Sequence, residues 1–236
     1  MERNPLIVIG VPTHDEGDAD TLFENWQRAT QADFGCVIID ADEDSATITE
    51  KVMKAGGQVH VNQRPEEYLF PNYKSESGAE RVAACVNQFD RLYNHDVIVN
   101  VHAKLPELSA DLLRALMYPL ANMDVEVATL VAPLNKHQAN SAEFLKAEIE
   151  WNENLRIHVL ENSRAGRVIN IARNVSDLTP GVEIVRHVPI YAYKRASLDR
   201  FVRFEPTIRE MEERLEPERA LSNGMRVEAV MADDFT

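Results

Sequence analysis

The sequence predicts an α/β protein with a mostly parallel sheet that is covered by helices on both faces. Two observations lead to this prediction. Short, continuous apolar runs rich in Val and Ile alternate with longer segments in which apolar residues recur every three or four positions. The apolar runs are not interrupted by polar residues, as expected of strands buried on both faces. Such alternation of strands and helices is typical of a doubly wound sheet.

In the first half of the chain the expected elements follow one another closely. Strands are expected at 6–11, 36–39, 58–61, 96–101 and 125–131, and helices at 18–30, 45–55, 77–93 and 109–117. Asp18 and Asp20 are suited to cap the first of these helices. The Gly56-Gly57 pair is a normal signal for the end of the second.

After Pro133 the pattern changes to shorter strands with polar turns between them. Strands are expected at 144–151, 156–160, 167–171, 183–193 and 226–231, and helical segments at 198–203 and 206–221. We expect residues 1–236 to form a single domain with 144–193 as a β-rich extension. Trp151 and Ile157 are expected to be exposed there, and because such edges are usually covered, a homodimer is predicted.

Composition and charge exclude several classes of protein. A chain of 236 residues with 44% hydrophobic residues can bury a sizeable core. The 25 basic and 39 acidic residues give a net charge of −14, which argues against binding to nucleic acid or to an anionic membrane. The apolar run at 6–9 is too short for a signal peptide or a membrane span.

Cys36 and Cys85 lie in apolar patterns and are expected to be buried, reduced thiols of a cytoplasmic protein.

A candidate ligand site follows from the order of the strands. Ligands of open α/β sheets bind beyond the carboxyl ends of the strands, here between the first and the fourth. His14 and Asp15 follow the first strand, and Asn100, His102 and Lys104 lie at the end of the fourth. These residues predict a polar binding site or a His/Asp metal site. The alternative is that they are solvated loop residues.

A second candidate is the acidic cluster of Asp40, Asp42, Glu43 and Asp44. Such a cluster suits Mg²⁺ or Ca²⁺, but it equally suits the start of the following helix, and we favour the latter. No dinucleotide-binding glycine motif, no P-loop and no G-x-S-x-G elbow occurs in the sequence. The long polar segment at 62–76 is expected to be a functional loop.

Five segments resemble the 3-deoxy-manno-octulosonate cytidylyltransferases (CMP-KDO synthetases). The sequence SGAERVA at 77–83 resembles S-G-T-[DE]-R-[LIV]-A, and VIVNV at 97–101 resembles the start of V-I-V-N-V-Q-G-D-E-P. The other three are ATLVAP at 128–133, HVPIYAY at 187–193, and 206–224, which resembles P-[ST]-P-L-E-x-x-E-x-L-E-Q-L-R-x-L-x-x-G. Their order and spacing make the resemblance specific.

The resemblance implies a nucleotide-diphospho-sugar transferase fold and a homodimer. It also implies a reaction that joins CTP to an eight-carbon sugar acid for lipopolysaccharide synthesis, supported by two Mg²⁺-type ions. It adds Arg81 to the candidate cleft. On the side of the sugar acid it implies four residues, namely His187, Tyr191, Glu210 and Glu213.

The departures from the family pattern affect the residues that bind phosphate and metal in the family. The family's opening motif P-A-R-x-x-S-x-R-L-P-G-K-P corresponds to residues 12–18, which contain acids but neither Arg nor Lys. His102 replaces the Gln of Q-G-D-E-P and Lys104 replaces its metal-binding Asp. The chain also ends before a V-D-T-P-x-D-L motif occurs. We therefore expect no bound metal, with Mg²⁺ required only if the ancestral activity is retained.

Three functions follow as hypotheses. The first is a catalytically impaired or silent homologue that binds a sugar acid, CTP or CMP. The second is an active cytidylyltransferase that forms CMP-KDO or a related CMP-sugar. The third is a different enzyme that uses His14 and His102.

Overall fold

The computed structural model describes residues 4–10, 19–31, 35–42, 45–62, 78–102, 105, 108–157, 160 and 163–232. The chain divides into two compact units, residues 1–110 and 111–236. The expectation of a single domain with 144–193 as an extension stays a prediction. Among the described residues, none of the helices combines the length and the apolar character that a membrane span requires.

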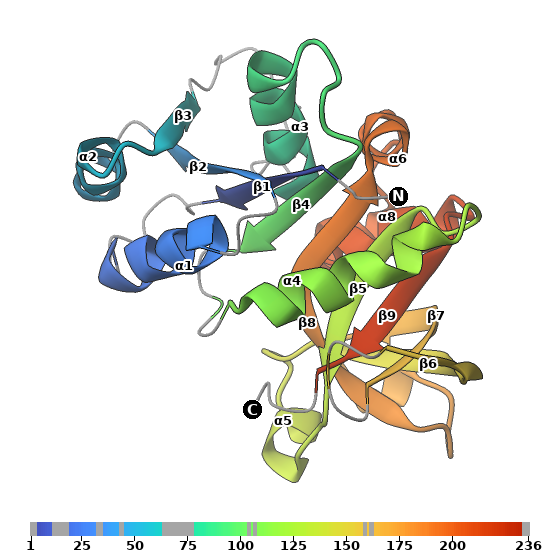
Figure 1. Cartoon of the computed structure of the whole chain (residues 1–236). Helices are drawn as coiled ribbons and strands as arrows, with labels where there is room; N and C mark the ends of the chain where they lie inside the picture. Colours follow the sequence, from blue (N-terminus) through green and yellow to red (C-terminus); the bar gives the residue numbers. More distant parts are fainter. Residues whose placement is uncertain are drawn as a thin grey trace. The chain divides into compact units, whose positions relative to one another are not determined.

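The first unit contains a four-stranded parallel sheet, as predicted. Its strands are β1 (Pro5–Gly10), β2 (Cys36–Asp42), β3 (Gln58–Asn62) and β4 (Val97–His102), in the order β3-β2-β1-β4. All three pairings within it are parallel. The helices α1 (Ala19–Gln31) and α2 (Ala46–Lys54) lie on one side of this sheet and α3 (Gly78–Phe89) lies on the other (Figure 1).

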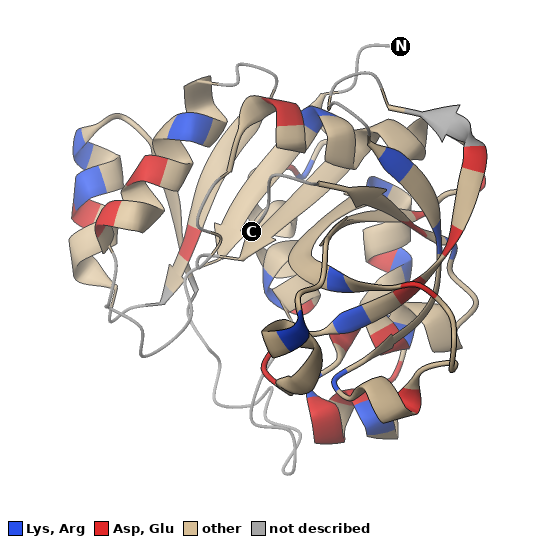
Figure 2. Ribbon diagram, turned by 90° about the horizontal axis from the view of Figure 1, so that it is seen from below, with Lys and Arg blue, Asp and Glu red and all other residues tan. Residues whose placement is uncertain are grey.

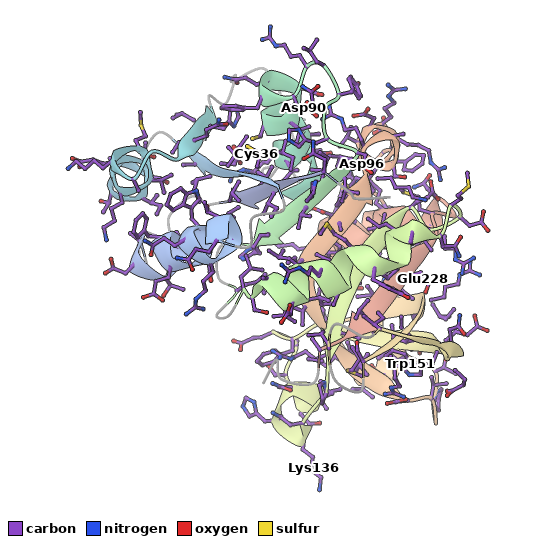
Figure 3. All side chains as sticks on the ribbon, viewed as in Figure 1. Cys36, Asp90, Asp96, Lys136, Trp151 and Glu228 are labelled. Carbon is purple, nitrogen blue, oxygen red and sulfur yellow. The ribbon has the colours of Figure 1, made fainter. Side chains whose placement is uncertain are left out.

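Local sequence explains where these helices pack and end. Trp26 is 7% exposed and lies so close to Gly57 that a Cβ atom there would be 2.5 Å from its ring. The helix α2 therefore needs glycine after its end, and Gly56 has a φ of +82°. The helix α3 ends at Phe89, earlier than predicted, because Asp90 (Figure 3) accepts backbone N–H bonds from the residues that follow, at 2.8 and 3.2 Å.

The second unit contains a sheet that closes on itself. Its strands are β5 (Val127–Ala132), β6 (Lys146–Arg156), β7 (Arg164–Ala172), β8 (Ile184–Lys194) and β9 (Val227–Met231). Within the unit their order is β8-β5-β9-β7-β6, and β6 pairs with β8 as well. Only β5 and β9 pair in parallel, and the other pairings are antiparallel. The prediction of a mostly parallel sheet is therefore wrong for this unit. A short connection favours the antiparallel direction for β6 and β7, whereas the other antiparallel pairs join strands that are far apart in the sequence.

The helices of the second unit are short. They are α4 (Ala110–Met117), α5 (Lys136–Asn140), α6 (Arg195–Phe201), α7 (Ile208–Glu213) and α8 (Glu216–Ser222), with 3₁₀ turns at Tyr118–Ala121 and Val175–Asp177. The single helical stretch expected at 206–221 is in fact α7 and α8. Arg214 interrupts it with a φ of 55°, and Pro217 lies in the first turn of α8.

The β-rich extension differs from the prediction in which apolar side chains it exposes. Ile157 is only 2% exposed, so the expectation that it is a surface residue is wrong. Trp151 (Figure 3) is half-buried, with the guanidinium of Arg164 4.1 Å from its ring centre. Ile169, Val175 and Val182 are exposed instead, at 49%, 41% and 40%. The strands and helices of this unit carry charged residues of both signs (Figure 2).

Both cysteines are free thiols, as predicted. Cys85 is buried in α3, whereas Cys36, at the start of β2, is only half-buried, contrary to the expectation of full burial.

Candidate functional site

The carboxyl edge of the first sheet holds part of the predicted cleft. The register of β1 and β4 places Gly10 beside His102 and Val8 beside Asn100. His102 is the last residue of β4 and is exposed, whereas Asn100 is 9% exposed within the sheet. The first and fourth strands are thus neighbours, as the cleft requires. His14, Asp15 and Lys104 lie outside the described residues.

A buried polar network lies between β2, β3 and α3. The Asp40 side chain has no exposure, and its Oδ2 atom accepts from Arg81 Nε at 3.0 Å and lies 2.9 Å from Nη2. The other oxygen, Oδ1, lies 2.5 Å from His60 Nδ1. Nε2 of the same ring lies 3.0 Å from Gln88 Oε1. The carboxylate of Asp40 therefore links β2, β3 and α3. Its two contacts with Arg81 also fix the orientation of the guanidinium.

This network changes the interpretation of the acidic cluster. Asp40 does not lie at the start of α2, as we favoured, but is buried inside β2 and pairs in register with His60 of β3. Ser45 is the residue before α2, and its side chain makes no capping hydrogen bond. The roles of Asp40 and His60 were not predicted. The signal was present, since an acid at the end of the buried run Val37–Ile39 needs a cationic partner.

The Mg²⁺ that the resemblance implies needs a set of oxygen ligands. One group of three potential ligands lies together in the described ranges, with atoms of Asp40, His60 and Cys85 within 4.8 Å of one another. Mg²⁺ takes oxygen ligands in near-octahedral geometry. This group offers one carboxylate beside a nitrogen and a sulfur, so it does not fit Mg²⁺.

In the second unit, His187 and Tyr191 lie in the core. His187 is 4% exposed, and its Nε2 atom is 3.0 Å from the hydroxyl of Thr129, which donates to the Ile190 carbonyl at 2.8 Å. The imidazole Nε2 is therefore the donor of the His187–Thr129 bond. Burial lowers the pKa of His187 to about 4. Burial and the nearby Glu216 carboxylate raise the pKa of Tyr191 well above its ordinary value.

The two predicted glutamates of α7 are held by arginines. Glu210 is 1% exposed and receives Arg219 Nε at 2.8 Å and Nη2 at 2.5 Å. It also closes a capping box with Thr207. Glu213 lies 3.2 Å from Arg209 in a half-exposed pair. The structure thus gives Glu210 and His187 internal partners, in addition to any role in binding a ligand.

The comparisons with known proteins agree with the resemblance. A family model described as cytidylyltransferase matches residues 22–227. The class of the protein is therefore that of the cytidylyltransferases.

Individual relatives narrow this class. The 3-deoxy-manno-octulosonate cytidylyltransferase of Paramagnetospirillum magneticum is 32% identical over 243 residues, covering 98% of this chain and 91% of the relative. That of Methylobacterium radiotolerans is 32% identical, covering 89% of this chain and 77% of the relative. The chain belongs to the family of 3-deoxy-manno-octulosonate cytidylyltransferases.

Solved structures support the fold. A CMP:2-keto-3-deoxy-manno-octonic acid synthetase complexed with CTP matches with a TM-score of 0.75 at 18% identity, covering 98% of this chain and 90% of that one. Rv0371c from Mycobacterium tuberculosis, in complex with manganese, matches with a TM-score of 0.54 at 10% identity and covers 99% of this chain and 90% of that one.

Proposed function

We propose that the protein is a CMP-KDO synthetase homologue that binds a sugar acid or a cytidine nucleotide and transfers the nucleotide weakly or not at all. The observation that supports this most directly is the end of β4, where His102 stands in place of the family's Gln and Lys104 in place of its metal-binding Asp. A protonated lysine has no acceptor atom and cannot bind a metal ion.

The charge of the segment after β1 supports the same proposal. Asp15, Glu16 and Asp18 stand where the family has the Arg and Lys of its opening motif. A carboxylate about 4 Å from a phosphate charge costs about 1 kcal/mol in water and more in a partly dry cleft. Three such acids in the segment after β1 disfavour a bound triphosphate.

When the protein is mixed with CTP, KDO and Mg²⁺ in a coupled assay, we expect pyrophosphate release to be absent or far slower than that of an active synthetase. Millimolar CTP with Mg²⁺ should also raise the melting temperature little, because stabilisation needs a ligand concentration above the dissociation constant. Lys104→Asp should not create activity, since the opening Arg and Lys would still be missing. The P. magneticum relative provides the positive control. Formation of CMP-KDO by the unmodified protein at a rate similar to that of the control would overturn the proposal.

The identity of 32% across 98% of the chain favours a second candidate, an active CMP-KDO synthetase that uses Mg²⁺. It requires that other residues replace the missing metal ligands and phosphate contacts. The same assay separates the two candidates, since the second predicts that CMP-KDO and pyrophosphate form in equal amounts.

We also propose that the protein is a homodimer, joined through the β-rich extension. The exposed side chains of Ile169, Val175 and Val182 support this, because apolar surface of this kind is commonly covered by a partner. Light scattering at micromolar concentration should give twice the chain mass of 26.7 kDa. Ile169→Asp should shift the mass toward that of the monomer, whereas a monomeric unmodified protein would contradict the proposal.

A further inference from the structure

The buried network of the first unit brings together a set of side chains that the proposed function does not use. Cys85 lies one helical turn after Arg81 on α3, and Gln88 lies one turn further, so all three share a face of that helix. This face meets Asp40 and His60, which are register neighbours in β2 and β3. The ligand atoms of Asp40, His60 and Cys85 are mutually within 4.8 Å, and all three residues are buried.

We propose that Asp40, His60 and Cys85 form a binding site for a transition-metal dication, of which Zn²⁺ is the best fit. Thiolate, imidazole and carboxylate are the ligands that Zn²⁺ takes in proteins, at about 2.0–2.3 Å in tetrahedral geometry. The ligand atoms are supplied by two adjacent strands and a packed helix, which fix their directions. A fourth position is left for water.

The neighbours of the three ligands are arranged as an outer shell. His60 Nε2 faces the side-chain amide oxygen Oε1 of Gln88 at 3.0 Å, which assigns Nδ1 to the metal. Arg81 holds Oδ2 of Asp40, which leaves Oδ1 beside Nδ1. Outer-shell partners of this kind orient the first ligands in many metal sites.

Binding of a dication would change the protonation of these groups. Burial raises the pKa of the Cys85 thiol, and the nearby Asp40 carboxylate raises it further, so the metal-free site holds a protonated thiol. A dication would displace that proton, because a metal ion binds the thiolate. The thiolate and the carboxylate then balance the two charges of the ion. The charge of Arg81 remains beside Oδ2 of Asp40, 2.9 Å away.

The test is a titration of the full-length, EDTA-treated protein with Co²⁺, which has visible absorption where Zn²⁺ has none. We expect a 1:1 complex with a thiolate-to-cobalt charge-transfer band and tetrahedral ligand-field bands, both abolished by an equivalent of Zn²⁺. Cys85→Ser should remove the charge-transfer band. Cys36→Ser, which changes the half-buried second cysteine, is the matched control and should leave it intact.

A surface variant keeps the test decisive if Cys85→Ser does not fold. Gln88 is exposed on α3, so Gln88→Ala should fold, and it should weaken Zn²⁺ binding by about 10- to 100-fold through loss of the outer-shell contact. Zn²⁺ affinity is measured by competition with a chromophoric chelator. Absence of a sulfur-to-cobalt band in the unmodified protein, or a band that Cys36→Ser removes, would overturn the proposal. Since no step depends on CTP or KDO, the outcome is independent of the proposed function.

Discussion

Glu210→Gln is expected to lower the free energy of unfolding by about 3–5 kcal/mol. The reason is the burial of its partner, because the Arg219 side chain is 0% exposed and Glu210 holds it through two nitrogens. Removing one charge of a buried pair leaves the other without compensation in a medium of low polarity. Glutamine has nearly the same shape as glutamate, so the loss of stability measures the effect of the missing charge rather than a change in packing. Urea unfolding followed by circular dichroism measures it.

The same helix provides the control. Glu213 pairs with Arg209 at 3.2 Å, but about a third of each of these side chains is exposed, so Glu213→Gln should cost less than about 1 kcal/mol. The double variant Glu210→Leu with Arg219→Met should recover part of the loss, because apolar groups of similar size need no compensation. The prediction would be contradicted if Glu210→Gln cost no more stability than Glu213→Gln and weakened sugar-acid binding. Glu210 would then contribute to ligand binding rather than to stability.

The sequence was most informative where strands are buried on both faces. The strands of the first unit were predicted to within a few residues because their apolar runs are continuous, as for Leu6–Ile9, which are at most 1% exposed. In the second unit the strands were found, but their directions were not. Whether β7 runs antiparallel to β9 depends on pairing between residues about 65 positions apart, which no local pattern encodes.

The same limit applies to the candidate site. Arg81 was singled out by its motif, but its partner Asp40 lies in β2. Asp40 in turn contacts His60 of β3, and only the register of β2 and β3 brings these two together. His187 and Glu210 were chosen from conserved-looking motifs of the resembled family. A motif cannot tell whether such a residue contacts a ligand or an internal partner, because both require the same side chain at the same place.

The second large effect expected is a loss of stability in mild acid that depends on His187. Burial lowers the pKa of this histidine from 6.5 to about 4 in the folded protein. Between those two values the unfolded chain binds a proton that the folded protein does not, so the free energy of unfolding falls as the pH falls through this range. At 1.36 kcal/mol for each pKa unit, the full effect is about 3 kcal/mol.

Comparison of the unmodified protein with His187→Gln isolates this effect, because every other titrating group is common to the two. The glutamine retains an N–H donor for Thr129 Oγ1, which His187 Nε2 reaches at 3.0 Å. The variant should be less stable at pH 7 through imperfect packing, and it should lose less stability between pH 6.5 and 4, by about 3 kcal/mol. Urea midpoints across that range measure the difference. If the stability of the two proteins fell in parallel with pH, His187 would have to become protonated in the folded state. That result would contradict the prediction, because it requires the β5–β8 pair to open.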